Sequence, residues 1–188
     1  MSLHPKLQDA VSRMRIADVI LKAIDASLSD GFVPEISLES DDVSFQLLTP
    51  ICRSVNSYEG QEADAGRRRT IFEMHAGLRV LAPRDAGYSD LPSDEIEKFI
   101  CARIECQFLV SYDEAQGDGS YIDDECLALF AEHNVPFNMW PYWREIVQSA
   151  CGRMGLPRII LPTHRLHKSA TQKADASLRV GPKPLADF

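Results

Sequence analysis

Two stretches of the chain alternate apolar and polar side chains almost without interruption. One covers residues 72–80 and the other residues 102–110. Alternation with a period of two places the apolar side chains of a strand on one face and the polar side chains on the other. Each stretch therefore predicts a β-strand with a single apolar face. Such a face must be covered by helices or by another sheet.

Two further strands are expected upstream of these. Residues 15–28 are rich in β-branched side chains and carry apolar residues on both faces, which is typical of a strand covered on both sides, by a second subunit or by the chain itself. After the turn signal Asp30-Gly31, Pro34 is expected to open a second strand over residues 35–48. Residues 50–69 are polar and are expected to form a loop.

An amphipathic helix is expected after the strands. Apolar side chains recur at helical spacing over residues 143–154. Pro141 is tolerated there only within the first turn, where its missing N–H has no partner in the helix. Gly155 followed by Pro157 is a stop signal. The pattern predicts a helix over residues 139–154.

Shorter helices are expected over residues 7–14 and 121–132. Together these elements predict an α+β fold, in which a four-stranded antiparallel meander is covered on one face by a long C-terminal helix. The folded domain is expected over residues 15–163, after an N-terminal helical segment over residues 1–14. The polar tail over residues 164–188 is expected to be poorly ordered.

Two motifs resemble those of the SecB-type protein-export chaperones. Residues 136–145 read Pro-Phe-Asn-Met-Trp-Pro-Tyr-Trp-Arg-Glu, and Arg153 and Pro157 follow at similar spacing. Residues 32–38 read Phe-Val-Pro-Glu-Ile-Ser-Leu, similar to the start of the family's second strand. With the strand alternation, the resemblance covers about residues 15–162. It implies an ATP-independent holdase that binds non-native polypeptides in an apolar groove.

The resemblance also implies which residues contact clients and which contact other subunits. Client contacts are expected at Phe32, Ile36, Leu38, Trp140 and Tyr142, although each of these side chains is also explained by ordinary core packing. Subunit contacts are expected at Val19, Leu21, Trp143, Arg144 and Glu145. The family assembles as a dimer of dimers, so a homotetramer is expected first and a dimer second.

Two groups of partners follow from the resemblance. Clients are expected to be secretory precursors or, as in the toxin–antitoxin–chaperone branch of the family, an antitoxin. The export motor ATPase is a further expected partner. Two departures weaken that export role. The tail after His164 has few apolar residues, whereas export members continue there into a second long helix. Asp18 and Asp25 are out of register with the acidic residues on which the family docks the ATPase.

Composition excludes several other classes of protein. The formal net charge of −8 opposes nucleic-acid binding, which needs a basic surface. No apolar run reaches the length of a membrane span, and the N-terminus lacks the plan of a signal peptide. The odd count of five cysteines without a CxxC pair predicts a reducing cytoplasm rather than a disulfide framework.

The alternative function is a small-molecule-binding or thiol-dependent α+β enzyme with its site between sheet and helix. The five cysteines lack metal-ligand spacing, and His164-x-x-His167 needs further ligands to hold a metal, so neither a metal nor a cofactor is expected. A closed pocket and a cysteine with a lowered pKa would favour the enzyme. A long open apolar groove would favour the chaperone, and the lack of any groove would favour a purely structural assembly protein.

Overall fold

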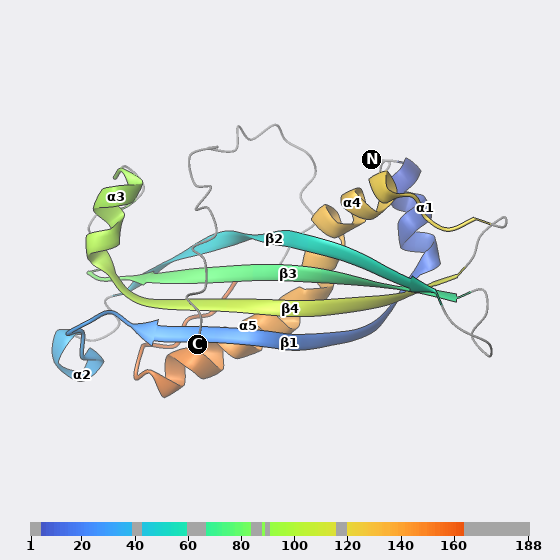
Figure 1. Cartoon of the computed structure of the whole chain (residues 1–188). Helices are drawn as coiled ribbons and strands as arrows, with labels where there is room; N and C mark the ends of the chain where they lie inside the picture. Colours follow the sequence, from blue (N-terminus) through green and yellow to red (C-terminus); the bar gives the residue numbers. More distant parts are fainter. Residues whose placement is uncertain are drawn as a thin grey trace, which may run out of the picture.

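The computed structural model describes residues 5–38, 43–59, 67–83, 88, 91–115 and 120–163 (Figure 1). Its elements follow one another in the order α1 (Pro5–Arg13), β1 (Met14–Leu28), α2 (Pro34–Ser37), β2 (Ser44–Glu59), β3 (Arg67–Leu81), α3 (Ser93–Ile96), the 3-10 helix η3 (Glu97–Phe99), β4 (Ile100–Ala115), α4 (Asp124–His133) and α5 (Val135–Arg153). The α+β class with a four-stranded antiparallel sheet and a long C-terminal helix is confirmed.

The four strands lie side by side in the order β1-β4-β3-β2. Every neighbouring pair is antiparallel. The expected meander is therefore correct only for β2, β3 and β4, because β1 pairs with β4 instead of β2. As a result β1 and β2 form the two edges of the sheet. Leu28, at the end of β1, and Ser44, at the start of β2, therefore lie on opposite edges of the sheet.

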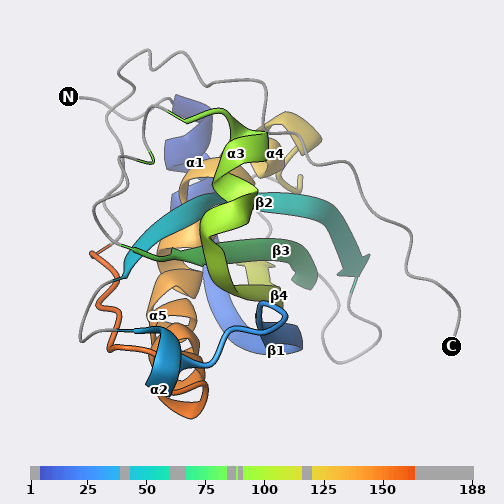
Figure 2. The same cartoon turned by 90° about the vertical axis from the view of Figure 1, so that its left-hand side faces the viewer.

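The core lies between one face of the sheet and the helices. Phe72 lies opposite Val110, and Met74 lies opposite Phe108, so the alternating apolar residues of β3 and β4 share this face. All four of these side chains are buried. Figure 2 shows α5 along the same side of the sheet. Trp143 of α5 packs edge-on against Phe108, with ring centroids 6.5 Å apart.

The second strand was predicted in the wrong place. Residues 34–37 form the single helical turn α2, with Pro34 at its start, and β2 begins only at Ser44. The difference arises because Phe32 and Leu38 pack against the core instead of pairing in a ladder. Ile36 therefore lies on a helical turn, and it does not share the face of a strand with Leu38.

The predicted loop over residues 50–69 is instead mostly sheet, since β2 continues to Glu59 and β3 starts at Arg67. An edge strand tolerates this polar sequence because half of its surface is open to solvent. Shifts of register occur between Leu48 and Ile51, on either side of Pro50, which has no N–H to donate to a ladder.

The C-terminal helix begins earlier than predicted: α5 starts at Val135, not at residue 139. Pro141 therefore lies inside the helix and not in its first turn. Asn134 joins it to α4, whose N-cap Asp123 accepts a hydrogen bond from the Cys126 N–H. The predicted stop is confirmed, since α5 ends at Arg153 and Gly155 has a φ of 70°. The tail beyond residue 163 lies outside the described residues.

Candidate functional site

A groove runs between the edge strand β2 and helix α4. Its first pocket has a volume of about 470 Å³ and is lined by residues 50–55 of β2 together with Ala128, Ala131 and Glu132 of α4. A second pocket, of about 410 Å³, is lined by Val55, Ser57, Arg68, Asp124, Leu127 and Ala128. Because the two pockets share Val55 and Ala128 in their linings, they are adjacent, and we call the pair the β2–α4 groove.

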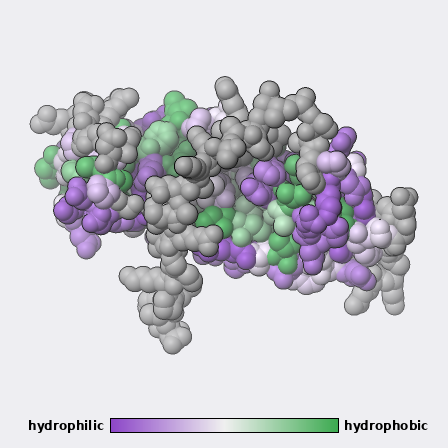
Figure 3. Space-filling view, turned by 90° about the horizontal axis from the view of Figure 1, so that it is seen from above, coloured by the Kyte–Doolittle hydropathy of each residue, from purple (hydrophilic) through white to green (hydrophobic). Residues whose placement is uncertain are grey.

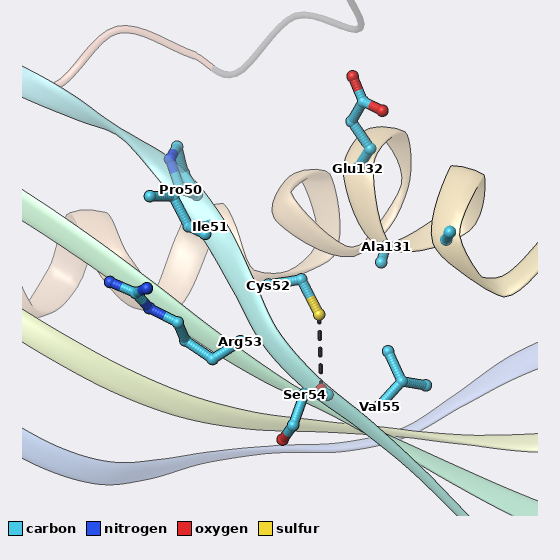
Figure 4. A pocket seen from close by; sticks show the side chains of 9 residues that line it. Pro50, Ile51, Cys52, Arg53, Ser54, Val55, Ala131 and Glu132 are labelled. Carbon is cyan, nitrogen blue, oxygen red and sulfur yellow. Dashed lines mark hydrogen bonds between the residues drawn. The ribbon is translucent and has the colours of Figure 1, made fainter. Parts of the chain in front are cut away.

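The sheet register and small helix residues together create this groove. Cys52 lies opposite Met74 and Val55 lies opposite Phe72, so both side chains are on the face of the sheet that carries the helices. Figure 4 shows them pointing toward α4, while Arg53 and Ser54 point away. On the helix side, Ala128 and Ala131 fill little of the space. These two small side chains leave room between α4 and β2.

The two ends of the groove differ in chemistry. The end at Pro50 and Ala131 is mainly apolar, whereas the other end carries Ser57, Arg68 and Asp124. Arg68 is held in place there, because its Nε and Nη2 atoms lie 2.7 and 2.6 Å from the Glu114 carboxylate. Figure 3 looks onto the β2 edge and shows hydrophobic residues near the middle of this side of the molecule, with hydrophilic residues beside them.

The backbone of β2 is the third component of the groove. No described strand pairs with the outer edge of β2. The outward N–H and C=O groups of an edge strand can pair with an extended peptide, whose alternate side chains then enter neighbouring pockets. A bulged strand beside two pockets therefore offers main-chain pairing and apolar contact at once.

The cysteines do not have the properties of nucleophiles. Cys52 is the half-buried one of the five, and burial raises the pKa of its thiol, which donates to the Ser54 carbonyl at 3.5 Å. Burial raises the pKa of Cys106 to about 12 and that of Cys151 to about 11. A thiolate is the reactive form, so these shifts oppose thiol chemistry at neutral pH. The raised pKa values therefore give no support to a thiol-dependent reaction at these cysteines.

Within the described residues there is no group of three or more His, Cys, Asp or Glu side chains that could hold a metal ion. The His164 and His167 pair lies outside the described residues. None of the helices in this part of the chain is long and apolar enough to cross a membrane.

The five predicted client residues lie apart from the β2–α4 groove. Ile36 is 82% exposed on α2, and Tyr142 is half exposed on α5, so both are available for contact. Phe32 and Leu38 are half-buried and pack against the core. Trp140 is buried, and its indole Nε1 donates to the Pro162 carbonyl at 2.7 Å.

The predicted interface residues divide into two groups. Val19 and Leu21 lie on β1, where Leu21 is 40% exposed beside Ile24 at 48%. The other three lie on α5. Trp143 is 1% exposed and belongs to the protomer's own core. Arg144 is half-buried with its Nε lacking a hydrogen-bond partner, and Glu145 is exposed.

Sequence reasoning missed every residue of the β2–α4 groove. Residues 50–55 were assigned to a loop, so none of them was predicted to contact a client. Two signals were present: Pro50 stands between the β-branched Thr49 and Ile51, which is compatible with an edge strand, and Ala128 and Ala131 are closely spaced on a predicted helix. Neither signal states that the two elements meet.

The fold of this chain is also found among solved structures. No family model matches the chain, and no curated protein matches it. Among solved structures, the chain shares the fold of the SecB-like chaperones, as the two motifs predicted. One matching structure is that of the Mycobacterium tuberculosis SecB-like chaperone Rv1957 in complex with a ChAD peptide from the HigA1 antitoxin. The TM-score is 0.60 at 18% sequence identity, and the match covers 86% of this chain and 98% of that one.

Proposed function

We propose that this protein is an ATP-independent holdase chaperone of the cytoplasm, which binds extended segments of non-native polypeptides in the β2–α4 groove. The observation that carries the proposal is the groove itself: two adjacent pockets beside an unpaired edge strand. Binding to the unfolded form of a client lowers the concentration of free aggregation-prone chain, and this requires no chemical step.

The geometry suits an extended chain better than a small molecule. Residues 50–55 and Ser57 of β2 line the groove, and the strand from residue 50 to residue 57 spans roughly 25 Å at about 3.3 Å per residue. A small ligand prefers a closed cavity that buries most of its surface. An open hollow of this length instead matches a peptide whose alternate side chains enter the two pockets.

The exposed Ile36 adds a second contact point for clients. At 82% exposure it is the most exposed large apolar side chain among the described residues. An isoleucine on a single helical turn stabilises little in the protomer, but it can be covered by a bound chain. We propose that Ile36, with Tyr142, contacts client segments that extend beyond the groove.

The client class is proposed from chemistry and from the fold. The structural neighbour binds a peptide from an antitoxin. A segment of an antitoxin is therefore the first client to test, and secretory precursors are the second. For secretory precursors, the export motor ATPase would be the additional partner.

We also propose that the protein assembles through the β1 edge, as a tetramer or a dimer. Ile16, Leu21 and Ile24 lie on the helix side of this strand and are 40–48% exposed, while Ile20 is 49% exposed on the other side. Such an edge is an aggregation hazard unless another chain covers it.

The test of the holdase function is suppression of aggregation of a chemically denatured protein. Filling the shared wall of the two pockets with Ala128→Trp should weaken client binding about tenfold, equivalent to about 1.4 kcal/mol, because the indole occupies the space of client side chains. The matched control is Ala128→Ser, which keeps the space open and should retain activity. Wild-type protein that leaves aggregation unchanged, with the chain folded, would refute the proposal.

A further inference from the structure

Glu114 is a fully buried carboxylate at the end of β4, with a side chain that is 0% exposed. A buried carboxylate is costly unless charged and hydrogen-bonding groups surround it. Arg13 approaches one oxygen at 3.1 Å, and Arg68 approaches the other at 2.6 Å. The backbone N–H of Ile122 donates to the same oxygen that Arg13 contacts. Glu114 is thus fully engaged.

This single carboxylate joins segments that are far apart in the sequence. Arg13 is the last residue of α1, and its guanidinium also donates to the Ser120 carbonyl. Arg68 lies directly opposite Glu114 on β3, donates to the Ile122 carbonyl at 2.7 Å and stacks over the Tyr121 ring at 4.7 Å. The segment at residues 120–122 leads directly into α4, which starts at Asp124. The cluster therefore fixes where α4 begins.

Helix α1 holds α4 at a second place. Leu7 and Ala10 of α1 are buried, and they belong to the same core cluster as Cys126 and Leu127 of α4. Lys6 forms an ion pair with Glu125 nearby. Figure 1 shows α1 and the start of α4 beside each other at the same end of the sheet. The N-terminal helix thus packs on the helix that forms one wall of the groove.

The polar end of the groove contains the same residues. Arg68, Asp124 and Leu127 line it. Arg68 is fixed by Glu114, which Arg13 also holds, and Asp124 and Leu127 belong to the first turn of the helix that the cluster fixes. The other end, at Pro50 and Ala131, has no residue in the cluster. A change at α1 therefore reaches one end of the groove only.

We propose that Arg13 and Glu114 are positioning residues of the groove: α1, through its buried contact with Glu114, holds the polar end at the width that accepts an extended client. Replacing a buried ion pair by apolar side chains is often neutral for stability. The consequence of the pair here is geometric, because it fixes α4 against β3. This inference rests on the proposed holdase function and adds the N-terminal helix to the client site.

The test compares two labelled peptides of alternating leucine and serine, measured by fluorescence anisotropy. A nine-residue peptide spans both ends of the groove, and a five-residue peptide fills only the apolar end. In Arg13→Met the nine-residue peptide should bind at least fivefold more weakly, while binding of the five-residue peptide should change less than twofold. Arg13→Lys should recover most of the loss, because an ammonium group still reaches the carboxylate. The matched control is Arg15→Met, an exposed arginine two residues away opposite Asp113 on the other face of the sheet.

Leu7→Ser provides a second route if Arg13→Met does not fold, since it releases α1 from α4 and leaves the charges of the cluster in place. It should weaken binding of the nine-residue peptide alone. Equal weakening of both peptides, unchanged binding of both, or failure of Arg13→Lys to differ from Arg13→Met would overturn the inference. Failure of the wild-type protein to bind either peptide would instead overturn the proposed function on which it rests.

Discussion

The β1 edge of the sheet carries exposed apolar side chains on both faces, whereas the β2 edge has α4 packed beside it and pockets between the two. On β1, Ile20 and Ile24 are each about half exposed on opposite sides of the strand. On β2, Cys52 and Val55 face α4 across the groove. Both strands have two shifts of register, so bulges do not distinguish the edges. An edge with apolar side chains on both faces favours a permanent partner of fixed sequence, whereas an edge beside pockets favours transient ligands of many sequences.

The difference between the edges depends on where the sheet's own core is placed. The helices bury one face of β3 and β4 at the centre of the sheet, while side chains on both edge strands remain partly exposed. One protein can in this way use one edge strand for assembly and the other for client binding. Assembly and client binding should then be separable by mutation, and the predictions below test that separation.

The largest effect is expected from Trp143→Ala, because the Trp143 side chain of α5 is buried against the sheet. Its side chain is 1% exposed and packs edge-on against Phe108. The loss of a buried aromatic should lower the free energy of unfolding by about 3–5 kcal/mol. Urea denaturation gives this value from the midpoint and slope. The neighbouring control Tyr142→Ala, at a half-exposed side chain, should change it by only about 0.5 kcal/mol.

A charge on the β1 edge should abolish assembly and leave client binding intact. In Ile24→Asp a carboxylate replaces a half-exposed side chain, and burying it in an interface without a partner is strongly unfavourable. Light scattering should then report a particle of 21.0 kDa, the mass of one chain. Ser27→Asp places the same charge on the opposite face of the strand and should keep the assembly. A wild-type protein that is already monomeric at micromolar concentration would remove the proposed role of this edge.

Much of the sheet follows from local sequence, but the two edges do not. The alternation in residues 72–80 and 102–110 is visible because each strand has one buried and one polar face. Residues 50–59 are polar and bulged, and only pairing with β3 makes them a strand. The placement of β1 and β2 on opposite edges depends on β1 lying beside β4, which is a choice between distant partners. Local patterns carry no information about that choice.

The lack of local information about distant partners also explains why the candidate site was not predicted. Ile36 was predicted to contact clients, and the structure shows that its side chain is exposed, while the contact itself stays a prediction. Trp140 was singled out from its aromatic character, yet its burial follows from the return of residues 156–163 along the helix, which supplies the Pro162 carbonyl. The groove needs three elements to meet: β2, α4 and, through Glu114, α1. No single segment of sequence contains it.

A smaller effect is expected at Ile36, where the exposed side chain contributes to binding and not to folding. Ile36→Ser should weaken client binding by about three- to fivefold, since a partly covered aliphatic side chain contributes roughly 1 kcal/mol. Its stability should remain that of the wild type. Leu38→Ser should show the reverse, because Leu38 packs against the core and its replacement should lower the unfolding free energy by about 1–2 kcal/mol. If Ile36→Ser unfolds as readily as Leu38→Ser, α2 is part of the core and not a contact point for clients.

The smallest effect is a change in labelling rate at Cys52, and it reports directly on the groove. Burial raises the pKa of this thiol, so at neutral pH it should react with a maleimide more slowly than a free cysteine, and the rate should rise as the pH increases toward 9 and above. Cys101 and Cys106 are buried with pKa values of about 11 and 12, so they should remain unlabelled until the chain unfolds. A bound nine-residue peptide should slow Cys52 labelling severalfold, because the thiol lines the pocket that the peptide fills.

In the Ile24→Asp monomer the same protection should persist, since the two edges act separately. Loss of protection in that monomer, with its fold intact, would show that the groove needs the assembly and that the edges are coupled.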